Sequence, residues 1–106
     1  MAKKPTQQIA LAQNFLKNAR LARRLLDASS ITSFDTVYEI GPGRGTITAE
    51  LACTARKVIA VEKDALLVRR LYDRFQEIDN VQIIEADFLH YCIPDKEYGN
   101  AGNHLL

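Results

Sequence analysis

Residues 38–45 read Tyr-Glu-Ile-Gly-Pro-Gly-Arg-Gly, in which a short apolar segment runs directly into a loop with three alternating glycines. Glycine has no Cβ atom, so such a loop lets the backbone approach a bound ligand closely. A second apolar run, 58–61, ends in Glu62, twenty-one positions after Gly41. A strand, a glycine loop and an acid about 20 residues later are typical of a nucleotide-like cofactor site, where the carboxylate accepts hydrogen bonds from ribose hydroxyls.

The spacing of the glycines separates this loop from the dinucleotide-binding form. That form has its third glycine, or an alanine, three residues after the second. Here Thr46 stands at that position, and the third glycine is Gly45. We therefore expect S-adenosylmethionine rather than NAD as the cofactor. Two alternatives stay open: the loop is an ordinary tight turn, and Glu62 is a solvated residue at the end of a strand.

Hydrophobic periodicity predicts strands that alternate with helices. The expected elements are a helix over 19–28 capped by Asn18, a strand over 36–40, a helix over 46–55, a strand over 57–62, a helix that Asp64 caps and that runs to 78, and a strand over 81–86. The expected buried faces consist of Leu21, Leu25 and Ala28, then Ile47, Leu51 and Ala52, then Leu67, Leu71, Phe75 and Ile78. This order predicts an α/β fold of parallel strands with right-handed crossover helices.

Three residues of interest follow the ends of successive predicted strands. They are Gly41, Glu62 and Asp87. Ligands of parallel sheets bind beyond the carboxyl ends of the strands. We therefore expect these three residues to converge on one site.

At 106 residues, with 47% apolar and 25% charged residues, the chain has the composition of one small globular domain. It contains no run of about 20 apolar residues that could span a bilayer. The polar start, 1–8, leads into no apolar signal-peptide core, so we expect a cytoplasmic protein without a membrane partner. Cys53, Cys92, His90 and His104 share no ligand spacing, so we expect incidental thiols, surface histidines and no metal site.

The net charge of +1 hides an asymmetry along the chain. Residues 1–26 carry six basic residues and no acid, which gives +6, whereas the remainder has eight basic and thirteen acidic residues, which gives −5. The six are Lys3, Lys4, Lys17, Arg20, Arg23 and Arg24. Such a basic segment suggests contact with a nucleic acid. The alternative is a solvated helix face that happens to be basic.

Four motifs between residues 13 and 89 resemble those of the ribosomal RNA adenine dimethyltransferases. They are Gln-Asn-Phe-Leu at 13–16, the glycine loop at 39–48, Val-Glu-Lys-Asp at 61–64 and Glu-Ala-Asp-Phe-Leu at 85–89. The first motif is far more specific than the glycine loop, because most methyltransferases lack it. The resemblance implies the N-terminal half of a Rossmann-like, S-adenosylmethionine-dependent methyltransferase fold. It divides a single, incomplete domain into a basic arm with the first motif (1–18), a cofactor-binding core (19–92) and an irregular tail (93–106).

The resemblance also implies dimethylation of N6 of an adenine in ribosomal RNA. One branch of the family modifies 23S rRNA and confers resistance to macrolide, lincosamide and streptogramin B antibiotics. The other modifies adjacent adenines of 16S rRNA during small-subunit maturation. Arg44 stands where the 16S enzymes usually carry an apolar residue, and Ala12 precedes Gln13 where they often have glycine; both favour the 23S branch. The 16S branch is the alternative, and so is an RNA-binding segment without catalysis.

Carried over by position, the resemblance assigns eight residues to the cofactor: Asn14, Leu16, Gly41, Gly43, Gly45, Glu62, Asp87 and Phe88. Asn14 and Leu16 would contact it from the segment before the first helix, although Leu16 also suits a core position. Gly41 would pass close to the methionine part, and Gly43 and Gly45 would shape the turn.

The acids and aromatic residues of the later motifs would hold the adenosyl part. Glu62 would bind the ribose hydroxyls, Asp87 would accept from the adenine amino group, and Phe88 would line the slot of the ring. Ionised carboxylates only accept hydrogen bonds, which suits a diol and an amine. As alternatives, Asp87 caps a turn and Phe88 is a core residue. Phe15 and Tyr91 either stack on a base or pack at the sheet edge.

The family's catalytic motif, Asn-aliphatic-Pro-aromatic after a fourth strand, does not occur in this sequence. Asn100 and Asn103 are present near the expected place, but neither is followed by that triplet. We therefore expect no catalytic residue in the chain and no methylation by the chain alone. Three strands with two crossover helices would also leave a sheet edge exposed, which favours self-association.

Overall fold

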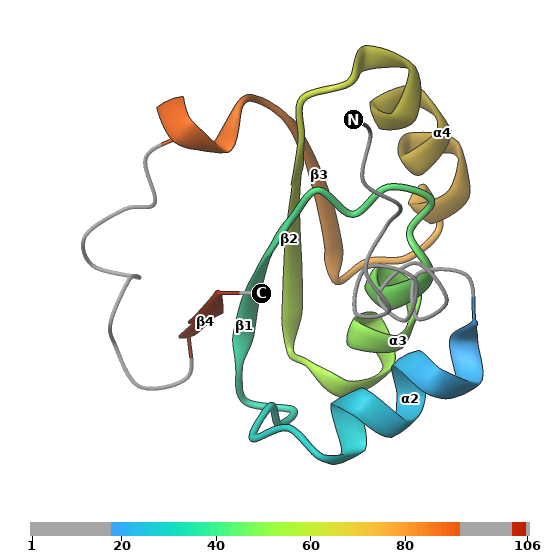
Figure 1. Ribbon diagram of the computed structural model, residues 1–106, viewed down its shortest axis with the longest axis vertical. Coiled ribbons are helices and arrows are strands. Elements are labelled where there is room, and N and C mark those ends of the chain that lie inside the picture. Colours follow the sequence, from blue (N-terminus) through green and yellow to red (C-terminus); the bar gives the residue numbers. More distant parts are fainter. Residues whose placement is uncertain (1–17, 92–102, 106) are drawn as a thin grey trace, which may run out of the picture.

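A computed structural model of the chain describes residues 18–91 and 103–105, and Figure 1 shows their arrangement. The strands are β1 (Thr36–Ile40), β2 (Lys57–Glu62), β3 (Val81–Glu85) and β4 (Asn103–Leu105); the helices are α2 (Ala19–Asp27), α3 (Thr46–Thr54), α4 (Ala65–Phe75) and the 3-10 turn η1 (Phe88–His90). The strands form one sheet in the order β3-β2-β1-β4, and every neighbouring pair is parallel. In Figure 1 the three α-helices lie together on one side of the sheet, and η1 lies on the other. The predicted α/β fold with parallel strands is confirmed.

Side-chain caps start two of the helices where the sequence predicts them. The side chain of Asn18 accepts hydrogen bonds from the amides of Arg20 and Leu21, and that of Asp64 accepts from the amides of Leu66 and Leu67. Each cap satisfies donors that a first helical turn leaves without a partner. These caps fix the residues at which α2 and α4 begin.

The core lies between the sheet and the α-helices. It consists of two adjoining clusters, Leu26, Val37, Leu51, Ala55 and Val58, and then Ala60, Val68, Leu71, Phe75 and Ile83. The predicted face of α2 is wrong by one position, because Ala22 and Leu26 are buried while Leu25 is 42% exposed. Leucines occupy 21, 25 and 26, so two helix faces have a similar apolar pattern. Contact with α3 decides between them.

Helix α4 is shorter than predicted, since it ends at Phe75 and Ile78 is 42% exposed. The residues after it form a turn in which the amide of Ile78 donates to the Phe75 carbonyl at 3.0 Å and the amide of Val81 donates to the Ile78 carbonyl at 3.3 Å. An apolar residue at helical spacing therefore falls beyond the helix. The turn leads directly into β3.

The second face of the sheet carries its own apolar cluster. Tyr38, Ile59 and Val61 are buried there, and Phe88 and Tyr91 pack against them. Of the two alternatives for Tyr91, packing on the sheet is therefore the one that the structure shows. The same contacts place η1 against this face.

Strand β4 is not predicted by the sequence, which indicates irregular chain over 93–106. Its three residues pair with β1 in parallel, from Thr36 with Asn103 to Tyr38 with Leu105. A segment of three residues has too few positions for a periodic pattern, so its conformation comes from pairing with β1. The expectation of an irregular tail is wrong for these three residues; the segment 92–102 lies outside the described residues.

One edge of the sheet is partly occupied. The hydroxyl of Tyr72 on α4 donates to the carbonyl of Ile83 at 3.0 Å, and the amide of Val81 is bonded to the turn before it. The Ile83 carbonyl and the Val81 amide lie on the edge of β3 that faces away from β2, its neighbour in the sheet. Self-association through an exposed edge stays a prediction.

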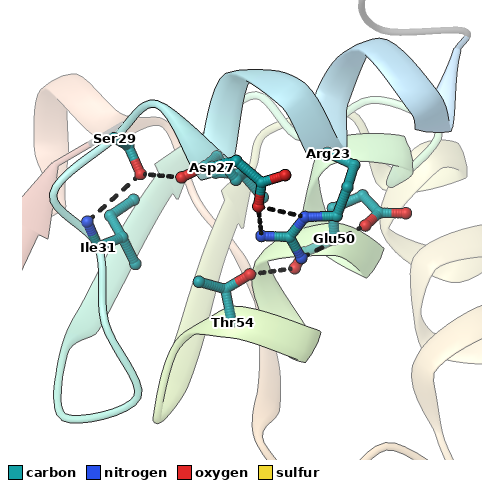
Figure 2. Close-up of polar contacts among 7 residues, drawn as sticks. Arg23, Asp27, Ser29, Ile31, Glu50 and Thr54 are labelled. Carbon is teal, nitrogen blue, oxygen red and sulfur yellow. Dashed lines mark hydrogen bonds and ion pairs between the residues drawn. The ribbon is translucent and has the colours of Figure 1, made fainter.

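Figure 2 shows how one of the basic residues of α2 is used within the fold. The Nε atom of Arg23 donates to Asp27 Oδ1 at 3.0 Å, and its Nη1 atom lies 3.7 Å from Glu50 Oε2 on α3. Arg23 therefore links α2 to α3. Arg20 and Arg24 are exposed, and neither side chain has a polar contact within 18–91. Of the three described basic residues in 1–26, Arg20 and Arg24 are therefore the two whose side chains are free to contact a nucleic acid.

Candidate functional site

The glycine loop turns through three residues with left-handed backbone. The φ angles are +64° at Gly41, +59° at Gly43 and +88° at Gly45, values that favour glycine over residues with a Cβ atom. The amide of Gly41 donates to the Val61 carbonyl at 2.9 Å, which extends the pairing of β1 with β2. A Cβ atom on Gly41 or Gly43 would have no heavy atom within 4 Å. At these two positions the loop therefore leaves open space beside its backbone.

At Gly45, packing as well as backbone conformation requires glycine. It is buried, and a Cβ atom there would lie 2.6 Å from Phe75 Cε2 and 3.0 Å from Leu71 Cδ2. Both neighbours belong to α4. Gly45 thus lets α4 pack directly against the loop, and it faces that helix and not the open space.

Glu62 joins the loop after β2 to the glycine loop. Its Oε2 atom accepts a hydrogen bond from the amide of Asp64 at 3.0 Å, and its Oε1 atom accepts from the amide of Gly43 at 3.4 Å. The residue is only 7% exposed, so the alternative of a solvated strand end is wrong. Each carboxylate oxygen can accept a second hydrogen bond. The group therefore keeps acceptor capacity for a diol.

Asp87 caps η1, because its Oδ1 atom accepts from the amide of Leu89 at 3.1 Å. Its Oδ2 atom has no polar contact within 18–91, so capping leaves one oxygen for a ligand amine. Phe88 is half-buried, packs against the second face of the sheet and also borders the open space above it. For both residues the structural alternative and the ligand role are compatible.

These residues meet at one pocket of about 300 Å³ at the carboxyl ends of β1, β2 and β3. It is lined by Ile40, Gly41, Val61, Glu62, Lys63, Ala86, Asp87, Phe88 and Leu89. The predicted convergence of Gly41, Glu62 and Asp87 is confirmed. Gly43 and Gly45 do not line the pocket, and Asn14 and Leu16 lie outside the described residues.

The pocket has apolar walls and two carboxylates, which suits an adenosyl group with its flat ring, its ribose diol and its amine. Five lining residues are not predicted as site residues: Ile40, Val61, Lys63, Ala86 and Leu89. All five fall within the motifs at 39–48, 61–64 and 85–89, and this position is the available sequence signal. A larger pocket, of about 540 Å³, lies between the end of α4 and β3. It contains none of the predicted site residues.

A buried carboxyl group that is not among the predicted site residues lies two positions before the first glycine of the loop. Glu39 is 4% exposed and accepts a hydrogen bond from the hydroxyl of Thr48 in the first turn of α3. Burial raises the pKa of Glu39 from 4.5 to about 7, against the opposing effect of the Thr48 hydrogen bond. The pair ties β1 to α3 on either side of the loop.

Neither a metal site nor a membrane-spanning helix is found among the described residues. No group of three or more His, Cys, Asp or Glu side chains within them is placed to hold a metal ion. None of the helices in this part of the chain is both long and apolar enough to cross a membrane. His90 is exposed, as expected from the sequence.

Comparison with known proteins places this geometry in a family. The family model "Ribosomal RNA adenine dimethylase" matches residues 5–104. The chain is 46% identical over 86 residues to Ribosomal RNA small subunit methyltransferase A of Koribacter versatilis, an alignment that covers 81% of this chain and 30% of that relative. The chain thus spans about a third of the length of that curated relative.

Solved structures give the same result for the fold. The structure of 23S rRNA methyltransferase ErmE matches with a TM-score of 0.67 and 31% identity, over 74% of this chain and 32% of that chain. Phosphoethanolamine N-methyltransferase 1 of Haemonchus contortus, in complex with phosphoethanolamine and S-adenosylhomocysteine, matches with a TM-score of 0.62 and 27% identity, over 77% of this chain and 17% of that chain. The fold is the N-terminal half of a Rossmann-like, S-adenosylmethionine-dependent methyltransferase fold, and the chain belongs to the ribosomal RNA adenine dimethylase family.

Proposed function

We propose that this chain supplies the cofactor-binding part of an S-adenosylmethionine-dependent rRNA adenine N6-dimethyltransferase. The observation that carries the proposal is the convergence of Gly41, Glu62 and Asp87 on one pocket beyond three neighbouring strand ends. Family membership supports it, because a methyl donor and an adenine acceptor are what a ribosomal RNA adenine dimethylase requires. S-adenosylmethionine is the cofactor that this fold implies.

Within this proposal, each predicted site residue has one role. The carboxylate of Glu62 accepts from the ribose hydroxyls, and Oδ2 of Asp87 accepts from the adenine amino group. Phe88 covers one face of the adenine ring, and the open backbone at Gly41 lets the methionine part pass. Gly43 acts through its hydrogen bond to Glu62, and Gly45 acts through its contact with α4. Asn14 and Leu16 stay proposed contacts from before α2.

Methyl transfer needs groups that turn the target base out of its stack and hold its N6 atom in line with the sulfonium methyl group. We assign no described residue to that task. The chain's part in the reaction is therefore to bind and orient the methyl donor. The complete activity, ribosomal RNA as the partner and a cytoplasmic location are proposed for the protein as a whole.

We propose 16S rRNA of the small subunit as the target. The relative named for the ribosomal small subunit, which is 46% identical to the chain over 86 residues, supports this proposal. Arg44 and the Ala12-Gln13 pair favour 23S rRNA and an antibiotic-resistance role, which stays the alternative. Methylation assays on immature small subunits and on free 23S rRNA, with the protein that carries the catalytic motif, separate the two. Transfer to 23S rRNA alone would contradict the 16S proposal.

Glu62→Gln is expected to weaken the binding of S-adenosylhomocysteine roughly tenfold to a hundredfold, because a hydrogen bond to a charged acceptor is worth about 1.5–3 kcal/mol. Glutamine keeps the volume but turns one acceptor oxygen into a donor. Isothermal titration calorimetry gives the dissociation constant directly. Circular dichroism of each variant checks that the fold is kept.

Glu85→Gln is the matched control for this experiment. Glu85 is the register partner of Glu62 on β3, has the same charge and is exposed. Its substitution is expected to leave the affinity unchanged. An equal loss in both variants would point to net charge and not to the ribose contact, and an unchanged affinity in Glu62→Gln would contradict the proposed site.

A further inference from the structure

Helix α4 and its cap contact two of the three segments that build the cofactor pocket, the glycine loop and the end of β2. At its N-terminal end, the amide of Asp64 donates to Glu62 Oε2 at 3.0 Å. At its C-terminal end, Nη1 of Arg74 donates to the carbonyl oxygen of Arg44 at 2.6 Å. The glycine loop is therefore held from outside by a side chain thirty residues later in the sequence.

The bond from Arg74 fixes one particular peptide group. The carbonyl of Arg44 and the amide of Gly45 belong to the same planar unit, and that amide donates to the Pro42 carbonyl at 2.9 Å. A planar group bonded at both its oxygen and its nitrogen cannot rotate without losing a hydrogen bond. This plane sets the direction in which the chain leaves the loop and begins α3.

The guanidinium of Arg74 is itself held in position. Its Cζ atom lies 5.3 Å from the centroid of the Phe75 ring, which is within the range of a cation–π contact. The same ring packs against Gly45, where it leaves no room for a Cβ atom. A preorganised guanidinium loses little conformational freedom when it donates a hydrogen bond. Arg74 and Phe75 thus contact adjacent residues of one turn, Arg44 and Gly45.

We propose that Arg74 is a positioning residue of the cofactor site, which holds the peptide plane between Arg44 and Gly45, and with it the glycine loop, in the ligand-binding orientation. The inference rests on the cofactor site proposed above. Arg74 does not line the pocket, so its effect on affinity passes through the loop and not through contact with the ligand. It adds a determinant that lies outside the sequence motifs of the site.

Arg74→Met tests the inference, because methionine keeps an unbranched apolar stem and removes the donor. We expect S-adenosylhomocysteine to bind roughly fivefold more weakly, as a lost hydrogen bond of ordinary strength implies. Arg74→Lys, which restores one charged donor, is expected to recover part of the loss. Arg70→Met is the control: Arg70 lies one turn earlier on α4, is exposed, and has no polar contact within 18–91.

Amide hydrogen exchange supplies a readout that general destabilisation does not reproduce. In Arg74→Met without ligand, the Gly45 amide is expected to exchange faster, while the amides of β2 keep their wild-type rates. Unchanged affinity and unchanged Gly45 exchange in Arg74→Met would overturn the inference, and so would an equal loss of affinity in Arg70→Met. Failure of the wild-type chain to bind would instead contradict the proposed function, and the exchange of Gly45 would then decide whether Arg74 holds the loop.

Discussion

Gly45→Ala is expected to lower the free energy of unfolding by about 3 kcal/mol, whereas Gly43→Ala is expected to lower it by about 1 kcal/mol. Both positions have positive φ angles, +88° and +59°, so both substitutions place a Cβ atom in left-handed backbone. Only at Gly45 does the new atom also collide, at 2.6 Å from Phe75 Cε2. The backbone costs about 1–2 kcal/mol at either site, and overpacking adds about 1–3 kcal/mol at Gly45.

Urea denaturation followed by circular dichroism measures the difference between the two variants. The urea concentration at the midpoint should fall further in Gly45→Ala than in Gly43→Ala. The slope of the unfolding free energy against urea concentration should stay that of the wild type. The Phe75→Leu background provides a second check, because the smaller side chain removes part of the collision. There the cost of Gly45→Ala should shrink, which a double-mutant cycle detects. Equal costs for the two alanine variants would contradict the packing role of Gly45.

Glu39→Gln is expected to remove a pH dependence of stability worth about 3 kcal/mol. The pKa of Glu39 in the folded chain is about 7 against an ordinary value of 4.5, so the folded state holds the proton more tightly than the unfolded state. The stabilisation from this group is complete below pH 4.5 and is lost as the pH rises through 7. Each unit of difference between the folded and the unfolded pKa corresponds to about 1.4 kcal/mol.

Unfolding free energies at pH 5, 6, 7 and 8 provide the measurement. Glutamine at position 39 can still accept from the Thr48 hydroxyl, and it has no charge to bury. The variant should therefore gain stability relative to the wild type as the pH rises, by about 2.5 kcal/mol between pH 5 and 8. Glu85→Gln, at an exposed position on β3, should follow the wild type. Parallel curves for Glu39→Gln and the wild type would contradict a neutral buried carboxyl group.

Local sequence patterns predict the order of strands and helices in this fold. The strand β2 is almost wholly apolar, which is typical of a central parallel strand, and it lies between β1 and β3 as expected. Asn18 and Asp64 are cap residues by type, and both cap the predicted helices. The face of α2 and the short strand β4 are not readable in this way, because contacts with α3 and β1 decide them.

In the candidate site, too, the local sequence predicts some features and long-range contacts determine the others. The glycine loop, Glu62 and Asp87 are predicted by motif and spacing, and parallel topology alone brings their strand ends together. The contacts of Gly45 with Phe75 and of Arg44 with Arg74 join segments thirty residues apart, and no local pattern indicates them. Glu39 is intermediate: an acid at a helix-facing position of an otherwise apolar strand indicates burial, but its Thr48 partner emerges only when α3 packs on β1.

The most direct test of the account follows the backbone amide signals of the ¹⁵N-labelled chain during titration with S-adenosylhomocysteine. We expect the largest shifts at Gly41, Lys63 and Asp87, which meet at the pocket beyond the strand ends. Gln76, Asp79 and Gln82, which line the larger pocket between α4 and β3, should keep their positions. Shifts confined to that second set, or a spectrum of the folded chain that the ligand leaves unchanged, would contradict it.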